Sequence, residues 1–238
     1  NDFNSMAFLT AGVVIGMIYI FEKRRGFLIK GFPCLLSPEF LSKALHVTLM
    51  SVMAESLDLE SLTVKDTFEA VNKDMSDENN PYTKEVIETV LSKYGINNQG
   101  DTIHAKSWRL NRQEIAVWYG IRALRKYASR TSMPQEEFLV KWKSTFPPFS
   151  PFSIDIKMLK GWYFKPALTN IQYVSKDILP LDAKDRFKML FKLQSQWDLE
   201  DISAFVEELN VKGLKIDNFI MKYARKKRVG KRNIVSGR

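Results

Sequence analysis

Lysine and arginine side chains are the main candidates for partner binding in this chain. Residues 212–238 hold ten Lys or Arg side chains and one acidic side chain, so their net charge of +9 equals the formal net charge of the whole chain. Such a segment attracts polyanions over about one Debye length, roughly 8 Å at physiological salt. Phosphate groups and acidic protein surfaces are the partners that it favours; the alternative is a solvated tail without a partner.

A second concentration of cations occupies residues 105–130, which hold seven basic side chains and one acidic side chain. Residues 1–104 have a net charge of −5 and residues 131–211 a net charge of −1. The excess positive charge is therefore confined to two segments, and any anion-binding surface should be built from them.

Side chains that support catalysis or metal binding are scarce. The single cysteine excludes a disulfide framework within the chain and a cysteine-rich zinc site. Cys34 lies in the apolar sequence FPCLL and is predicted to be an inert core thiol, His46 to be structural, and His104 to be exposed. Walker A, GxGxxG, GxSxG and HExxH motifs are absent from the sequence. These features predict a non-enzymatic protein without a cofactor or metal, in a reducing compartment such as the nucleus or cytosol.

The longest apolar stretch, residues 7–21, has 15 residues and is shorter than the roughly 20 that a membrane helix needs. We expect a buried strand or hairpin instead, with residues 12–21 as one strand and 27–36 returning, and no membrane association. The sequence does not begin with Met, so we expect the C-terminal part of a longer protein.

An internal repeat organises the rest of the chain. Each copy begins with a long amphipathic helix, continues with two shorter helices around a break, and ends in a strand-like stretch. The helix pairs begin at residues 62, 132 and 197, which are 70 and 65 residues apart. The predicted helices are 37–57, 62–74, 81–95, 111–129, 132–146, 153–164, 182–196, 197–210 and 214–228, and the strand-like stretches are 104–111, 163–176 and 228–235.

Helix, helix, helix and β-hairpin is the order of a winged-helix domain, a variant of the helix-turn-helix. The predicted fold is mainly α with small β-hairpins, in three tandem winged-helix units. The predicted bounds are 37–110, 111–181 and 182–238. Residues 1–36 form a β-rich segment, which belongs either to a preceding barrel-like region or to the first unit.

Local signals support the predicted helices. Thr63 with Asp66 and Ser132 with Gln135 fit first-turn caps, and Asp198 fits a third. Five tryptophans occupy apolar positions of these elements and are predicted to pack in the core rather than to stack on bases: Trp108, Trp118, Trp142, Trp162 and Trp197.

The predicted helices and strands assign a position to each basic residue. In the predicted helix 214–228, Ile216, Phe219, Ile220 and Tyr223 form the buried face, while the opposite face presents Asn218, Lys222, Arg225 and Lys226. Lys227, Arg228, Lys231 and Arg232 continue into the hairpin. Arg122, Arg125 and Lys126 share one face of the helix 111–129. In DNA-bound winged helices the third helix often enters the major groove.

Several stretches resemble one family of proteins. They run from Leu35 to the C-terminus and cover most of the chain: LLSPEFLSKALHVTLMSVMAESLDL, NPYTKEVIETVL, WYGIRALRKYASRTSMPQEEFLVKWKSTFPPF, RFKMLFKLQSQWDLEDISAFVEELN and GLKIDNFIMKYARKKR. The chain is similar to the C-terminal region of the defective-in-sister-chromatid-cohesion family, an accessory subunit of the alternative, chromosome-transmission-fidelity replication factor C clamp loader.

The resemblance implies a nuclear, non-catalytic adaptor subunit that supports sister chromatid cohesion. It implies docking on the catalytic subunit of DNA polymerase epsilon and on DNA, with PCNA as an indirect partner. The clamp loader's large subunit and the small cohesion subunit would bind an N-terminal region that is largely absent from this sequence. ATP hydrolysis would belong to other subunits, in agreement with the absent Walker motif.

Two roles are assigned to the cations under this resemblance. Polymerase docking is assigned to Lys222, Arg225 and Arg238. DNA binding is assigned to Arg109, Arg112, Arg122, Arg125, Lys126, Lys226, Lys227, Arg228, Lys231 and Arg232. The alternative function is a nonspecific single- and double-stranded DNA-binding module that recruits the loader to chromatin.

Overall fold

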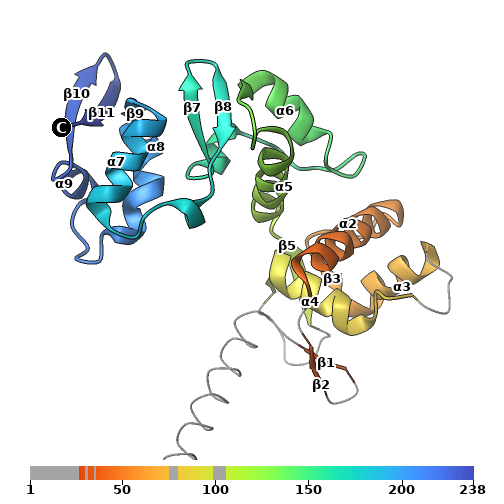
Figure 1. The fold of residues 1–238 in the computed structure, drawn as a ribbon. Coiled ribbons are helices and arrows are strands. Elements are labelled where there is room, and N and C mark those ends of the chain that lie inside the picture. Colours follow the sequence, from red (N-terminus) through yellow and green to blue (C-terminus); the bar gives the residue numbers. More distant parts are fainter. Residues whose placement is uncertain (1–26, 30–31, 35, 75–79, 99–105) are drawn as a thin grey trace, which may run out of the picture. The chain divides into compact units, whose positions relative to one another are not determined.

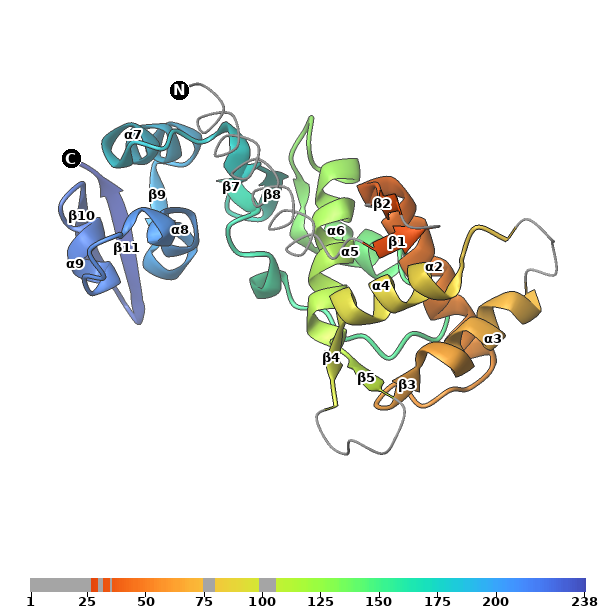
Figure 2. The same cartoon turned by 90° about the horizontal axis from the view of Figure 1, so that it is seen from below.

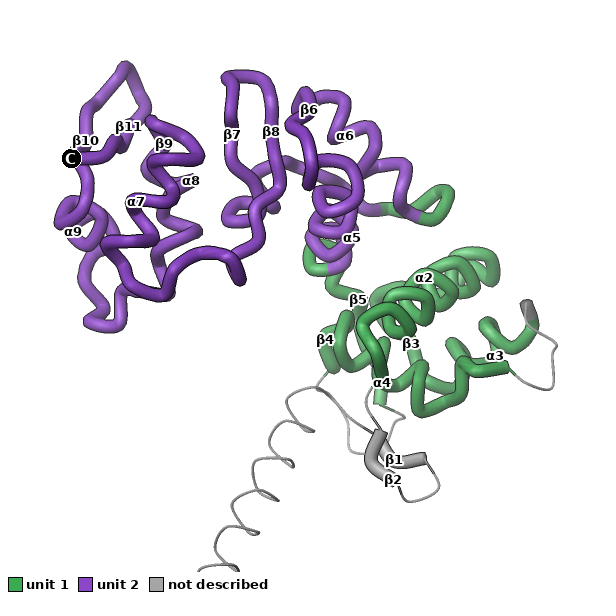
Figure 3. Tube along the Cα trace, viewed as in Figure 1, with its two compact units in different colours: residues 1–114, 147–151 green, residues 115–146, 152–238 purple. Residues whose placement is uncertain are grey.

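The computed structural model describes residues 27–29, 32–34, 36–74, 80–98 and 106–238. It is mainly α-helical with small antiparallel sheets, which confirms the predicted fold class (Figure 1). The chain divides into two compact units, one of residues 1–114 and 147–151 and one of residues 115–146 and 152–238 (Figure 3).

The first unit contains a short hairpin followed by the first repeat. In the hairpin, β1 (Phe27–Ile29) pairs with β2 (Phe32–Cys34). The predicted single strand 27–36 is therefore wrong, because its residues pair with one another as β1 and β2. The predicted strand 12–21, the Cys34 side chain and His104 lie outside what the structure describes. The repeat comprises α2 (Pro38–Ala54), β3 (Leu62–Thr63), α3 (Val64–Asp74), α4 (Lys84–Tyr94), β4 (Gly95–Asn97) and β5 (Ser107–Leu110).

Helix starts in the first repeat follow their local sequence. The backbone N–H of Asp66 donates to Thr63 Oγ1 at 3.0 Å, and this hydroxyl donates to the Asp66 carboxylate at 2.8 Å. The predicted Thr63–Asp66 cap is therefore confirmed. Ser37 caps α2 by accepting from the Phe40 N–H. His46 is exposed on α2, whose opposite side is buried through Leu41, Ala44, Leu45, Leu49 and Val52.

The second repeat comprises α5 (Arg112–Tyr127), β6 (Met133–Pro134), α6 (Gln135–Lys143), the 3-10 turn η1 (Ile156–Leu159), β7 (Tyr163–Ala167) and β8 (Asn170–Tyr173). The predicted hairpin in 163–176 is confirmed, but the predicted helix 153–164 is a single 3-10 turn. Gly161 takes a φ of +85°, and the chain then enters β7, where Tyr163 and Phe164 are buried. The predicted Ser132 cap is wrong, because the Gln135 N–H donates to the Thr169 carbonyl and the Ser132 hydroxyl accepts from Asn170.

The third repeat follows the short 3-10 turn η2 (Lys176–Ile178). It comprises α7 (Ala183–Leu193), β9 (Gln196–Asp198), α8 (Leu199–Val206), the 3-10 turn η3 (Glu207–Leu209), α9 (Ile216–Ile220), β10 (Ala224–Val229) and β11 (Arg232–Gly237). The predicted helix 214–228 is wrong beyond Ile220. Residues 224–229 instead form the first strand of a hairpin, because they pair with residues 232–237 in continuous register.

The sheets of the three repeats have the same connectivity. The strand orders are β3-β5-β4, β6-β8-β7 and β10-β11-β9, so the last strand of each repeat lies between the other two. Figure 2 shows this arrangement for the third repeat. The outer strands β3, β6 and β9 precede the second helix of each repeat and have only two or three residues, which the sequence patterns did not reveal. The winged-helix assignment and its domain bounds stay predictions.

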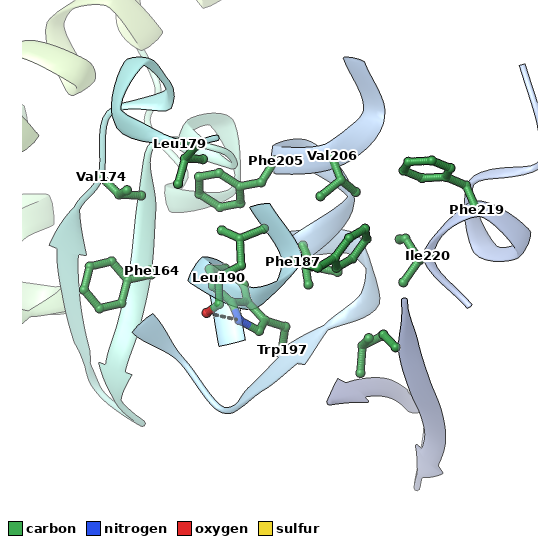
Figure 4. Packing of buried hydrophobic residues seen from close by; sticks show 13 residues of the cluster. Phe164, Val174, Leu179, Phe187, Leu190, Trp197, Phe205, Val206, Phe219 and Ile220 are labelled. Carbon is green, nitrogen blue, oxygen red and sulfur yellow. Dashed lines mark hydrogen bonds between the residues drawn. The ribbon is translucent and has the colours of Figure 1, made fainter. Parts of the chain in front are cut away.

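The second and third repeats share one hydrophobic core. Phe164, Val174 and Leu179 of the second repeat pack with Phe187, Leu190, Trp197 and Phe205 of the third (Figure 4). Trp197 Nε1 donates to the Leu190 carbonyl at 3.1 Å. Three of the five tryptophans, Trp108, Trp142 and Trp197, are fully buried, as predicted. Trp118 and Trp162 are half-buried.

Candidate functional site

The third hairpin, which we define as β10, β11 and the turn Gly230–Lys231, holds most of the C-terminal cations. The turn has two residues, and Gly230 takes a φ of +61°, which glycine adopts without steric strain. Residues 225–233 are all exposed. The hairpin therefore presents its cations to solvent on a regular scaffold.

Strand geometry sends these cations to both faces of the sheet. Residues 224, 226 and 228 share one face, because side chains alternate along a strand. Lys226 lies opposite the buried Val235, so this face is the one that covers the core. Arg225 and Lys227 occupy the opposite, outer face. The predicted helical face of Lys222, Arg225 and Lys226 is therefore wrong: Lys222 lies in the turn after α9, and the other two point apart.

Two cations of the third hairpin are bound to carboxylates. Lys226 Nζ lies 3.0 Å from an Asp217 oxygen. Arg232 makes a bidentate pair with Asp198, at 2.8 and 2.5 Å. The guanidinium lowers the pKa of the Asp198 carboxyl, chiefly through these hydrogen bonds. Asp198 stands at the N-cap position of α8 but accepts no capping bond there, so its predicted role as a cap is wrong.

Two further arginines bind backbone carbonyls. Arg238 Nη2 donates to the Met221 carbonyl at 2.7 Å, and its Nε lies 3.4 Å from the Ala224 carbonyl. Arg238 thus ties the end of the chain to the end of α9. Arg228 Nε donates to the Gly230 carbonyl within its own turn.

Four cations in or next to the third hairpin have no such side-chain partner. The side chains of Lys222, Arg225, Lys227 and Lys231 make no hydrogen bond or ion pair with any residue that the structure describes. An incoming anion can engage them without breaking an internal pair. We call these four residues the open cations.

The second basic segment is divided between the two units. In the first unit, Arg112 lies 2.7 Å and Arg109 4.0 Å from Glu60, so one carboxylate faces both predicted DNA contacts. In the second unit, Arg122, Arg125 and Lys126 are exposed on α5, as predicted.

Aromatic side chains support the α5 cations. The Arg122 guanidinium lies 4.9 Å from the Trp118 ring centroid, and Lys126 lies 4.9 Å from that of Tyr127. Arg125 Nε donates to the Tyr173 hydroxyl at 2.9 Å. The α5 end borders a hollow of about 440 Å³, which has no acidic residue in its lining: Arg125, Lys126, Tyr127, Ser129, Arg130 and Thr131.

A crevice of about 750 Å³ between the second and third repeats has a different character. Its charges are largely paired, with Lys160 lying 2.7 Å from Glu200 and 3.4 Å from Asp201. Glu200 raises the pKa of Lys160, and burial raises that of the neighbouring Tyr163 hydroxyl. These pairs link the two repeats, and we assign them a structural role.

Comparison with known proteins decides the family. A family model described as "Sister chromatid cohesion protein Dcc1" matches residues 17–206. The chain belongs to the Dcc1 family. It is 60% identical over 208 residues to the "Sister chromatid cohesion protein DCC1" of Saccharomyces cerevisiae, covering 87% of this chain and 54% of the relative. It is 29% identical over 105 residues, 41% of this chain and 27% of the relative, to a "Probable sister chromatid cohesion protein DCC1" of Dictyostelium discoideum.

This Dcc1-family chain spans about half the length, or less, of these relatives. Its third hairpin lies beyond the residues that the family model matches. The sequence identified the cations of this hairpin, but it missed Asp198 and Asp217, which bind two of them. No helix in the described ranges is long and apolar enough to cross a membrane.

Proposed function

We propose that this chain is a non-catalytic adaptor of the alternative PCNA clamp loader, acting in the nucleus in support of sister chromatid cohesion. The names of its relatives support the link to cohesion. The family resemblance supports contacts with the loader's large subunit and the small cohesion subunit through other parts of the protein, and docking on the catalytic subunit of DNA polymerase epsilon. The main observation in support of the docking role is that the four open cations are exposed and have no side-chain partner in the described part of the chain.

The four open cations fit an acidic protein surface on energetic grounds. A cation already held by a carboxylate must lose that pair before it binds a partner, which offsets much of the gain. Lys222 and Arg225 carry no such cost. Arg238, the third residue assigned to docking, stabilises the end of α9 through Met221 and so supports the position of Lys222. Its contribution therefore comes at least in part from positioning.

Replacing Lys222 and Arg225 together with alanine should weaken capture of the polymerase catalytic subunit. Two exposed charge pairs at about 0.5–1 kcal/mol each correspond to a loss of about 5- to 30-fold in affinity. Affinity is measured by pull-down titration with purified polymerase subunit. The control is Lys43→Ala with Lys65→Ala, which removes the same charge from two exposed lysines of the first unit. Equal binding by both double variants would contradict the docking role.

A nonspecific DNA contact is a second candidate function, supported by the acid-free hollow at the end of α5. DNA affinity should fall by about 0.7–0.9 log units per log unit of salt for each phosphate neutralised. Lys126→Ala with Arg130→Ala should lower that slope by up to about two phosphate equivalents. Fluorescence anisotropy with labelled single- and double-stranded DNA at several salt concentrations measures it. An unchanged slope would argue against DNA at this hollow.

A further inference from the structure

Strand β10 is an open edge of the third sheet. Among the described residues, the order β10-β11-β9 leaves one side of β10 without a neighbouring strand (Figures 1 and 2). Among the described sheets it is the longest edge strand, with six residues in continuous register and no proline. By contrast, β7 contains Pro166 and a register shift, and the outer strands β3, β4, β6 and β9 have two or three residues each. Proline, irregularity and short length all block strand addition.

The geometry of the third hairpin identifies the backbone groups on this edge. In a two-residue hairpin the residues flanking the turn, Val229 and Arg232, exchange both hydrogen bonds. Hydrogen-bonded and non-hydrogen-bonded pairs alternate along an antiparallel ladder, so Lys227 and Arg225 also bond to β11. The N–H and C=O groups of Ala224, Lys226 and Arg228 therefore point away from β11. The Ala224 carbonyl faces the Arg238 guanidinium at 3.4 Å, which agrees with this orientation. The backbone groups of Lys226 and Arg228 make no bond to described residues outside the ladder.

The side chains of β10 restrict what can pair with this edge. Residues 225–228 are four consecutive cations, Arg-Lys-Lys-Arg. A second copy of β10 would bring four like charges against these four, which disfavours association of the edge with itself. An extended segment rich in Asp or Glu would instead place negative charges against these four cations, which favours pairing. The charge sequence that prevents self-association therefore selects an acidic strand.

We infer that β10 binds an acidic, extended segment of a partner protein as a fourth strand of the third sheet. The inference rests on the proposed docking function and specifies how the docking site engages its partner. Main-chain hydrogen bonds to Lys226 and Arg228 supply a sequence-independent part of the affinity. Acidic side chains on the outer face meet Arg225 and Lys227, whose side chains bind no other residue in the described part of the chain.

The residues on and beside β10 indicate where the bound strand should carry acidic and apolar side chains. On the core-covering face, Lys226 is already bound to Asp217 at 3.0 Å, so an acidic residue contributes less there. On the outer face, Val229 is 53% exposed and follows Arg225 and Lys227 at strand spacing. The preferred ligand thus places acidic residues at alternate positions on the outer face and ends beside an apolar contact.

The first test uses the full chain and two peptides that differ only in their backbone. One is a fluorescein-labelled peptide of alternating glutamate and valine, and the other is the same peptide with an N-methyl group on every residue whose N–H would face β10. Removing the main-chain donors should weaken binding about tenfold. Equal affinity for the two peptides would show that charge alone drives binding and would overturn strand addition, while leaving the cationic docking role intact. No binding of the unmodified peptide overturns the inference as well.

A matched pair of variants of the protein tests the role of the β10 backbone, as the two peptides test the role of the ligand backbone. Lys226→Ala and Lys226→Pro lose the same charge and the same bond to Asp217, but only the proline removes the outward N–H. The proline variant should bind the unmodified peptide several-fold more weakly than the alanine variant, with amide hydrogen exchange of Arg228 slowed by peptide in the alanine variant only. Identical behaviour of the two variants overturns the inference, as does a concentration-dependent dimer that only the proline variant abolishes. If the proline variant does not fold, the peptide pair still decides.

Discussion

Replacing Arg186 with alanine should lower the free energy of unfolding of the second unit by about 3–5 kcal/mol. The Arg186 side chain is 1% exposed and lies on α7 within the core of the third repeat. Its Nε donates to the Pro180 carbonyl at 2.6 Å, and its Nη1 donates to the Phe205 carbonyl at 3.0 Å and to the Glu208 carboxylate. One guanidinium thus joins the segment before α7, the end of α8 and η3.

The loss of stability has two sources, unpaired carbonyl oxygens and a cavity. Two carbonyl oxygens lose their donor, and the buried guanidinium leaves a cavity. Arg186→Lys should be intermediate, because one ammonium cannot reproduce the planar fork that reaches three acceptors. Urea unfolding followed by tryptophan fluorescence measures the change. Lys188→Ala, an exposed position on the same helix, serves as the control and should stay within about 0.5 kcal/mol. A loss below 1 kcal/mol for Arg186→Ala would contradict the assigned role of this arginine.

Replacing Trp197 with alanine should destabilise the third repeat by a similar amount, about 3–5 kcal/mol. Trp197 is 1% exposed, packs edge-on against Phe205 at 5.4 Å, and lies opposite Val235 in the sheet. It therefore holds the third hairpin against α7 and α8. Because the open cations depend on this support, the variant should also weaken acidic-peptide binding.

Two companion substitutions separate the sources of this effect. Trp197→Phe keeps most of the ring volume and loses the bond to the Leu190 carbonyl, so it should cost about 1–3 kcal/mol. Trp118→Ala removes a tryptophan that is only half-buried and should cost less than Trp197→Ala. Thermal unfolding followed by circular dichroism compares the three. Equal losses of stability for Trp118→Ala and Trp197→Ala would contradict the expectation that burial of the side chain determines the size of the loss.

The repeat, most helices and the confinement of charge were predictable from local features. Apolar residues at helical spacing indicated α2, α5 and α7, and Thr63 with Asp66 marked the start of α3. These signals operate within a few residues of the chain. The short strands β3, β6 and β9 were missed because two or three residues carry no measurable periodicity.

The end of α9 shows where local reasoning failed. Ile216, Phe219, Ile220 and Tyr223 follow helical spacing, and the pattern runs on into Arg225 and Lys226 without a stop signal. The chain nevertheless leaves the helix after Ile220. Residues 224–229 gain a full hydrogen-bonded ladder with β11, which in turn pairs with β9, 36 to 40 residues earlier in the chain. A long-range pairing outweighed the local pattern, because each strand residue gains a cross-strand neighbour that no helix turn offers.

Local sequence features were enough to predict that this chain is mainly helical, contains three repeats and concentrates positive charge in its last residues. Periodicity and charge counts are properties of the chain, independent of how it folds. Which cations are open depends instead on the folded arrangement of the chain. Asp198 and Asp217 lie 34 and 9 residues from the cations that they bind, and folding alone brings them within hydrogen-bonding distance. Strand alternation then placed Arg225 and Lys226 on opposite faces, and the sheet order left β10 as an open edge.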